Sequence, residues 1–125
     1  MADRDLIAGD IREALETTPD PKPAARVVDP DRVRRYLLQH PWCEAPGCPN
    51  PAWHAHHVLY RSQGGDDVDA NLLALCGDHH AAVHQTRDPG LLVGVRLAVE
   101  GRDDVLRYLA GKGKAGLFLD RVYPR

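Results

Sequence analysis

The 125-residue sequence predicts a small α+β protein. Three observations indicate this class: helical spacing of apolar residues before residue 41, alternating apolar residues after residue 91, and a dense group of cysteines and histidines between them. Six of the seven histidines fall within residues 54–84, and the three cysteines lie at positions 43, 48 and 76. A chain of this size gains noticeably from a structural metal, because its own core is small.

Before residue 41 the sequence predicts two helices joined by a stiff connector. Residues 1–18 form a unit whose apolar side chains follow helical spacing over residues 3–16. Residues 19–28 are rich in proline and predict an extended linker. Asp29 then has the character of an N-cap, with Pro30 at the first helical position, so a second helix should begin there and end at Pro41. The stripe that should face the core of this helix comprises Val33, Tyr36, Leu37 and His40.

Residues 29–90 should form the central domain, and residues 91–125 an α/β extension. In the central domain, residues 42–53 predict a tight turn between two cysteines, and "HAHHV" predicts a strand. The stretch "SQGGDDVDAN" predicts a polar loop, and "GDHHAAVHQTR" predicts a helix. In the extension, "LLVGVRLAV" alternates apolar residues as a strand does, residues 103–110 predict a helix closed by glycines, and "GLFLDRVYPR" predicts another strand. The expected extension is therefore strand-helix-strand.

The composition is that of an ordinary globular protein, with 43% hydrophobic and 27% charged residues and a net charge of −2. No apolar run approaches the roughly 20 residues that span a bilayer. The charged N-terminus does not have the apolar segment of a secretion signal, so we expect an intracellular, cytoplasmic protein with no membrane partner. The net charge argues against a dedicated nucleic-acid scaffold, although residues 32–62 carry four basic side chains and one acidic.

Two closely spaced ligand pairs predict a structural zinc site. Cys43 and Cys48 form one pair, and Cys76 and His79 form the other, which together give the closed four-ligand sphere typical of structural zinc. Three cysteines cannot all pair as disulfides, and disulfides rarely form in the reducing environment inside cells. The alternative interpretation is that these cysteines are small buried apolar residues.

The remaining histidines predict a second metal site with a different character. Adjacent residues on a helix point about 100° apart, so His79 and His80 should serve different sites. His80 shares a helix face with His84, the spacing at which two imidazoles grip one ion. On the strand, His56 and His57 point to opposite faces, so one can join His80 and His84 while the other reaches toward substrate. Three protein ligands leave coordination positions open, as a catalytic metal requires.

The segment from "CEAPGC" through "HHVLYRSQGGDDVDANLLALCGDHHAAVH" closely resembles the HNH endonucleases. The resemblance rests on the paired histidines, the Gly-Gly loop, the asparagine before an apolar run and the Cys-x-x-His-His ending, and it covers about a third of the chain. It implies a ββα-metal core, treble-clef-like, within a zinc-binding frame. The long first cysteine spacing, His79 in place of a more common cysteine, and Tyr60 near a common proline position depart from the family pattern.

The resemblance also implies residue roles. His57 matches the general base that activates water, and Asn71 matches the asparagine that pins the loop and orients that base. His56, His80 and His84 match the ligands of a catalytic divalent ion, which would be Mg²⁺, Mn²⁺, Ni²⁺, Co²⁺ or Zn²⁺. The implied activity is hydrolysis of DNA phosphodiester bonds. The phosphate-contact candidates, by residue type, are Arg61, Arg32 and Arg35.

Each of these interpretations has a simpler rival. His57 could be an ordinary core or surface histidine, Asn71 a turn residue, and His84 a solvated helix residue. The arginines at positions 32 and 35 are equally consistent with a solvated charged face. For the whole protein the rival function is a non-catalytic zinc module that binds DNA or protein, and an RNA-directed hydrolase stays open. A homodimer, or a place in a phage, mobile-element or other DNA-processing complex, would fit the size by family analogy only.

Overall fold

A computed structural model describes residues 26–122, and within α7 it leaves the side chains at 115 and 119–121 undescribed. The helix expected within residues 1–18, and residues 19–25 of the connector, lie outside the described residues. The described elements are α3 (Pro30–Gln39), β1 (His54–His57), η1 (Arg61–Gln63), η2 (Asp69–Asn71), β2 (Leu72–Leu75), α4 (Gly77–Ala81), η3 (Ala82–Thr86), α5 (Pro89–Glu100), α6 (Asp103–Lys112) and α7 (Ala115–Val122). The predicted α+β class is confirmed: an antiparallel hairpin is followed by helices, consistent with a ββα-like core.

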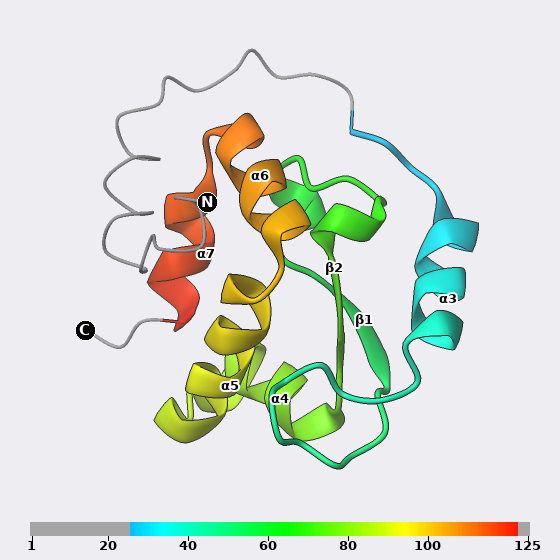
Figure 1. Ribbon diagram of the computed structural model, residues 1–125. Coiled ribbons are helices and arrows are strands. Elements are labelled where there is room, and N and C mark those ends of the chain that lie inside the picture. Colours follow the sequence, from blue (N-terminus) through cyan, green and yellow to red (C-terminus); the bar gives the residue numbers. More distant parts are fainter. Residues whose placement is uncertain (1–25, 123–125) are drawn as a thin grey trace.

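The hairpin of β1 and β2 lies between two helical layers (Figure 1). Its register pairs His54 with Leu75 and His57 with Leu72. Because side chains alternate along a strand, Leu73 and Leu75 join the larger core with α5, α6 and α7. Leu72 and Ala74 pack on the opposite face against Tyr36 of α3. Every residue of β2 is buried, as expected of a strand covered on both faces.

Helix α3 begins where the local sequence signals place it. The side chain of Asp29 accepts a hydrogen bond from the backbone N–H of Arg32 at 3.1 Å, and Pro30 occupies the first turn. Tyr36 is buried against β2, with Val33 and Leu37 packed beside it. The helix ends at Gln39, and His40 serves as its C-cap.

The helix predicted over "GDHHAAVHQTR" has two parts. Helix α4 covers Gly77–Ala81, and η3 continues it as a π-helical segment over Ala82–Thr86. Arg87 ends this segment in the left-handed region, with φ of 55°, and its N–H donates to the carbonyl of Ala82. Local π-helical turns are often found at functional sites.

The predicted strand-helix-strand extension is wrong, because all three of its elements are helices. The run "LLVGVRLAV" is apolar at almost every position, so it satisfies a helical period as well as an alternating one. The decisive signal is Asp88, which caps α5 by accepting from the N–H of Leu91 at 3.1 Å, followed by Pro89 in the first turn. The last segment is likewise helical, and α7 buries Phe118 and Val122 at helical spacing. The helix predicted over residues 103–110 is confirmed as α6, which continues through Gly111 to Lys112 and ends at the left-handed Gly113.

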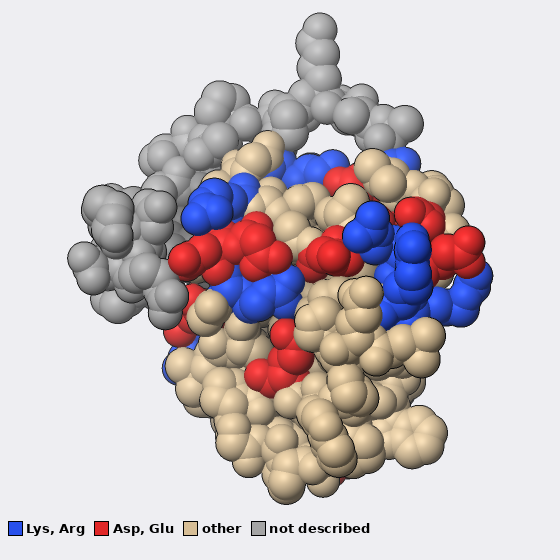
Figure 2. Space-filling view, turned by 45° about the vertical axis from the view of Figure 1, so that its right-hand side comes forward, with Lys and Arg blue, Asp and Glu red and all other residues tan. Residues whose placement is uncertain are grey.

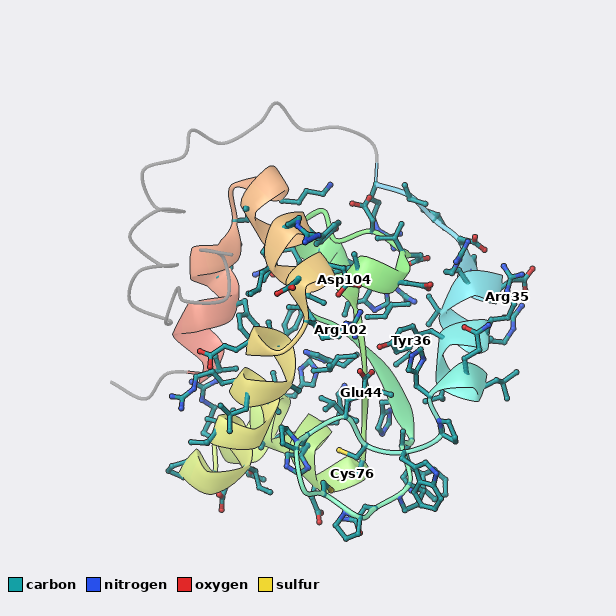
Figure 3. The ribbon with its side chains drawn as sticks, in the orientation of Figure 1. Arg35, Tyr36, Glu44, Cys76, Arg102 and Asp104 are labelled. Atoms are coloured by element: carbon teal, nitrogen blue, oxygen red, sulfur yellow. The ribbon has the colours of Figure 1, made fainter. Side chains whose placement is uncertain are left out.

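A polar cluster centred on Arg102 connects the helical layers through the hairpin. The guanidinium donates to the Tyr36 hydroxyl at 2.7 Å, to Glu44 at 3.2 Å and to both carboxylate oxygens of Asp104. It also donates to the backbone carbonyls of Leu72 and of η2. Figure 3 shows these labelled side chains converging from α3, the cysteine turn and α6. The Tyr36 hydroxyl in turn donates to Glu44. One side chain therefore satisfies polar groups from five parts of the chain: α3, the cysteine turn, η2, β2 and α6.

Within residues 26–122, no helix combines the length and the apolar character that crossing a lipid bilayer demands.

Candidate metal centres and catalytic site

Three thiols and one imidazole converge beside the end of the hairpin. The ligand atoms of Cys43, Cys48, Cys76 and His79 all lie within 4.8 Å of one another. The His79 Nδ1 atom is 3.2 Å from the Cys76 sulfur and 3.6 Å from the Cys43 sulfur. A left-handed Gly47, with φ of 78°, turns the chain so that the two sulfurs of the 43–48 pair face the same point. Three sulfurs and one nitrogen that converge in this way fit a structural zinc.

The thiols differ in how readily they ionise. Burial raises the pKa of the Cys43 thiol to about 11. Burial also opposes ionisation of Cys76, but hydrogen bonds from the backbone N–H and the side chain of His79 outweigh it and lower the pKa of Cys76 to about 6. Thiolate is the form that binds a metal, so Cys76 is the member of the set best prepared as a ligand.

Helix α5 closes the outer side of this cluster through a glycine. A Cβ placed on Gly94 would lie 2.8 Å from Nε2 of His79 and 3.3 Å from Cβ of Ala45. A hydrogen at this position thus allows α5 to approach the ligand ring closely. No local pattern in the sequence indicates this contact, because a glycine inside an apolar helical run does not reveal which distant side chain it will meet.

Three further histidines form a second cluster on the neighbouring surface. The ring nitrogens of His56, His80 and His84 lie within 4.8 Å of one another. His56 comes from β1 and is 3% exposed, whereas His84 lies in η3 and is exposed. Burial, together with the neighbouring rings of His54 and His84, lowers the pKa of His80 to about 4. The His80 imidazole is therefore neutral at pH 7, which is the form that binds a metal.

Two side chains support this trio from its edges. The ring of His54 stacks on His80, with centroids 4.2 Å apart. The Tyr60 hydroxyl lies 3.2 Å from Nδ1 of His84, and the two rings are stacked. The sequence interpretation assigned His54 no role, yet its alternation on β1 places it on the same face as His56.

The histidine trio opens into a surface cavity of about 380 Å³. The cavity is lined by Ala55, His56, His57, Tyr60, Arg61, Ser62, His80 and His84. The proposed base His57 and the three candidate ligands therefore share one opening, although His57 leaves β1 on the other face. Polar groups that converge on one cavity are the usual mark of a functional site.

His57 is held at one ring nitrogen by a carboxylate that the sequence interpretation missed. Its Nε2 lies 2.7 Å from Oδ1 of Asp67, and its side chain is 11% exposed. Burial lowers the pKa of His57, and the positive charges of Arg61 and Arg26 act in the same direction, against the opposing influence of Asp67. His57 is thus a neutral imidazole near pH 7.

Asn71 is fully buried and binds backbone rather than a histidine ring. Its side-chain oxygen accepts from the N–H of Leu59 at 2.8 Å, and its amide donates to the carbonyls of Leu59 and Asp66 at 3.0 Å each. Its own backbone carbonyl accepts from the N–H of Val58. Asn71 therefore ties the two ends of the long hairpin loop together directly after His57.

The three candidate phosphate-contact arginines occupy different places. Arg61 lines the cavity and keeps 58% of its side chain exposed, with Nε 3.8 Å from Asp67. Arg32 pairs with Asp69 at 3.4 Å, and Arg35 points outward from α3 (Figure 3); neither lines the cavity. Figure 2 shows acidic and basic side chains interspersed on the face in view rather than a continuous basic surface.

Comparison with known proteins gives one finding. The family model described as HNH endonuclease matches residues 41–86, which contain both ligand clusters, the hairpin and Asn71. Neither the curated proteins nor the solved structures gave a match. Residues 41–86 of this chain are an HNH endonuclease domain.

Proposed function

We propose that the protein is a metal-dependent endonuclease that hydrolyses DNA phosphodiester bonds with His57 as general base. The observation that carries this proposal is that His57 and the trio of His56, His80 and His84 line one cavity within the HNH domain. The trio supplies three ligands and leaves the remaining positions of an ion open to substrate, whereas the cluster of three cysteines and His79 supplies all four. The first set suits a catalytic ion and the second a structural zinc.

The protonation state of His57 suits the role of general base. Since its pKa lies below the ordinary value, the ring is neutral near pH 7 and can take a proton from water. Asn71 fixes the backbone immediately beyond His57, which limits the directions that the ring can adopt. A divalent ion held by the trio would supply charge stabilisation at the phosphate and at the departing 3′ oxygen. The expected products are 5′-phosphate and 3′-hydroxyl ends, as the family implies.

Arg61 is the best-placed phosphate contact. It lines the cavity beside His57, and most of its guanidinium side chain is exposed. Arg32 and Arg35 lie on α3, away from the cavity, and would contact only a more distant part of a nucleic acid.

Plasmid cleavage tests the proposal. Purified full-length protein should nick or cut supercoiled DNA with Mg²⁺, Mn²⁺, Ni²⁺ or Co²⁺ after chelator treatment. His57→Ala should lower the rate by roughly 10²–10⁴ without unfolding the chain. His40→Ala is the matched control, because His40 caps α3 outside the cavity and its loss should leave cleavage intact. Equal cleavage by His57→Ala and the wild type would refute the assigned base.

A metal count separates the nuclease from a non-catalytic zinc module. The nuclease should retain one zinc after mild chelation and bind a second, exchangeable ion that His80→Ala removes. A protein that binds a single zinc, and that cleaves neither DNA nor RNA with any of these metals, would be the binding module instead.

A further inference from the structure

We infer that Asp67 is a positioning residue for His57: its carboxylate accepts the Nε2–H of the ring and leaves Nδ1 as the nitrogen that receives the proton from water. The inference deepens the proposed function and rests on it for its catalytic meaning. Asp67 does not line the cavity, and its shortest contact with a residue that does is the one with His57, at 2.7 Å, whereas Nε of Arg61 lies 3.8 Å away. Two observations carry it, the contact itself and the way in which the rest of the chain fixes that carboxylate.

Both oxygens of the Asp67 carboxylate are engaged. Oδ1 lies 2.7 Å from His57 Nε2 and 2.7 Å from Nη2 of Arg26, and Oδ2 accepts from the backbone N–H of Asp29 at 2.8 Å. The side chain is 2% exposed, so water does not compete for these contacts. A carboxylate held at both ends cannot rotate away from the ring, which makes its direction a property of the fold.

The charge state of Asp67 decides which nitrogen of His57 carries the proton. Burial raises the pKa of the Asp67 carboxyl, but the Asp29 N–H, the His57 ring and Arg26 outweigh it, and the net pKa lies below the ordinary value. An ionised carboxylate can only accept hydrogen bonds. The Nε2 of His57 must therefore donate, and in a neutral ring this leaves the Nδ1 lone pair free.

The loop that carries Asp67 is itself clamped by residues outside the HNH domain. Arg26 donates from Nε to the carbonyl of Gly65 at 2.7 Å, and the N–H of Val27 donates to Asp66 at 2.6 Å. The N–H of Asp67 returns a hydrogen bond to the carbonyl of Val27 at 2.9 Å. Residues 26–29 thus run along the loop and hold the carboxylate against the hairpin. The alignment of the base depends on a segment that precedes the matched domain.

Asp67→Asn, compared with Asp66→Asn, tests the inference. An amide at position 67 keeps the shape but offers an N–H₂ group that can turn toward His57 and favour the wrong tautomer. We expect cleavage turnover to fall about 10–100-fold, with substrate KM and affinity for the second metal ion unchanged. Asp66 anchors the same loop through Val27, Tyr108 and Lys112 without touching His57, so Asp66→Asn controls for a loosened loop. Equal turnover in both variants would overturn the inference.

A measurement on the wild-type chain tests the same point without Asp67→Asn, and a variant serves only to assign the signals. In ¹⁵N-histidine NMR of the zinc-loaded full chain, the His57 signals, assigned by their loss in His57→Ala, should show the Nε2–H tautomer. The Nδ1–H tautomer would overturn the inference even if DNA is cleaved. Failure of the wild type to cleave any nucleic acid would instead refute the proposed function, while the tautomer would still decide the Asp67–His57 pairing.

Discussion

Replacing Gly94 by alanine should weaken zinc binding, because the added methyl group would meet the ring of His79, a member of the proposed zinc site. Its Cβ would lie 2.8 Å from His79 Nε2, where ordinary contact begins at 3.4 Å, so the shortfall is 3.4 − 2.8 = 0.6 Å. The ring cannot yield freely, since its Nδ1 faces the thiols. Overpacking of this kind costs roughly 1–3 kcal/mol. Because the displaced ring belongs to a candidate zinc ligand, we expect this cost to appear as a zinc affinity about 5–150-fold weaker.

The matched control is Gly111→Ala in α6. A Cβ at Gly111 has no neighbour within 4 Å, so no clash is expected there. Alanine favours a helix over glycine by about 1 kcal/mol or less, so this variant should be as stable as the wild type or slightly more stable. Zinc affinity would be measured by competition with a chromophoric chelator, and thermal midpoints with and without zinc. Gly94→Ala should lower the midpoint of the zinc form, and Gly111→Ala should hold or raise it. Unchanged zinc affinity in Gly94→Ala would show that α5 does not confine the ligand ring.

Two further predictions concern the hairpin loop and the response to acid. Gly65→Ala should abolish stable folding or lower the unfolding midpoint strongly, because the new Cβ would lie 1.8 Å from the carbonyl oxygen of Leu59. Gly77→Ala is the control, because a Cβ at Gly77 has no neighbour within 4 Å. Similar circular-dichroism melts for the two variants would contradict this prediction. The carboxyls of Asp66 and Asp104 both have pKa values below the ordinary range. Burial raises the pKa of Asp66, but the contacts with Lys112, the Val27 N–H and the Tyr108 hydroxyl outweigh it. The pKa of Asp104 is lowered mainly by its hydrogen bonds with Arg102. The stability that they contribute is therefore present above about pH 4 and lost as the pH falls through the folded-state pKa. Denaturant unfolding from pH 6 to pH 3 should show a shallower decline in the Asp66→Asn/Asp104→Asn double variant than in the wild type, and parallel curves would argue against it.

Local signals made much of the central region predictable. The cap at Asp29 with Pro30 defines the start of α3 within a few residues, and no distant contact is needed to see it. The i,i+4 spacing of His80 and His84 predicted a shared face, and the two ring nitrogens do lie together with that of His56. In both cases the information is contained in one turn or one strand, where backbone geometry alone decides direction.

The missed features depend on contacts between distant parts of the chain. The C-terminal strands were wrong because a run that is apolar at nearly every position carries no distinguishing period, and the cap at Asp88 outweighs the β-branched side chains. The pairing of His57 with Asp67 needs a loop closed by Asn71 and clamped by Arg26. Nothing in "GGDDVD" indicates which of its three aspartates will face a histidine. The proposed boundaries at residues 18, 28 and 90 stay predictions.

The Arg102 cluster links the matched domain to residues on both sides of it in the sequence. Residues 41–86 match the family, yet the guanidinium that satisfies Glu44 and the Leu72 carbonyl comes from beyond them, and so does the Tyr36 hydroxyl. A fragment of residues 41–86 would leave Glu44 without its Arg102 partner. It would also expose both faces of β2, whose four residues are all buried here by α3 on one side and by the C-terminal helices on the other. We therefore expect residues 41–86 to need the flanking helices α3 and α6 in order to fold as they do here.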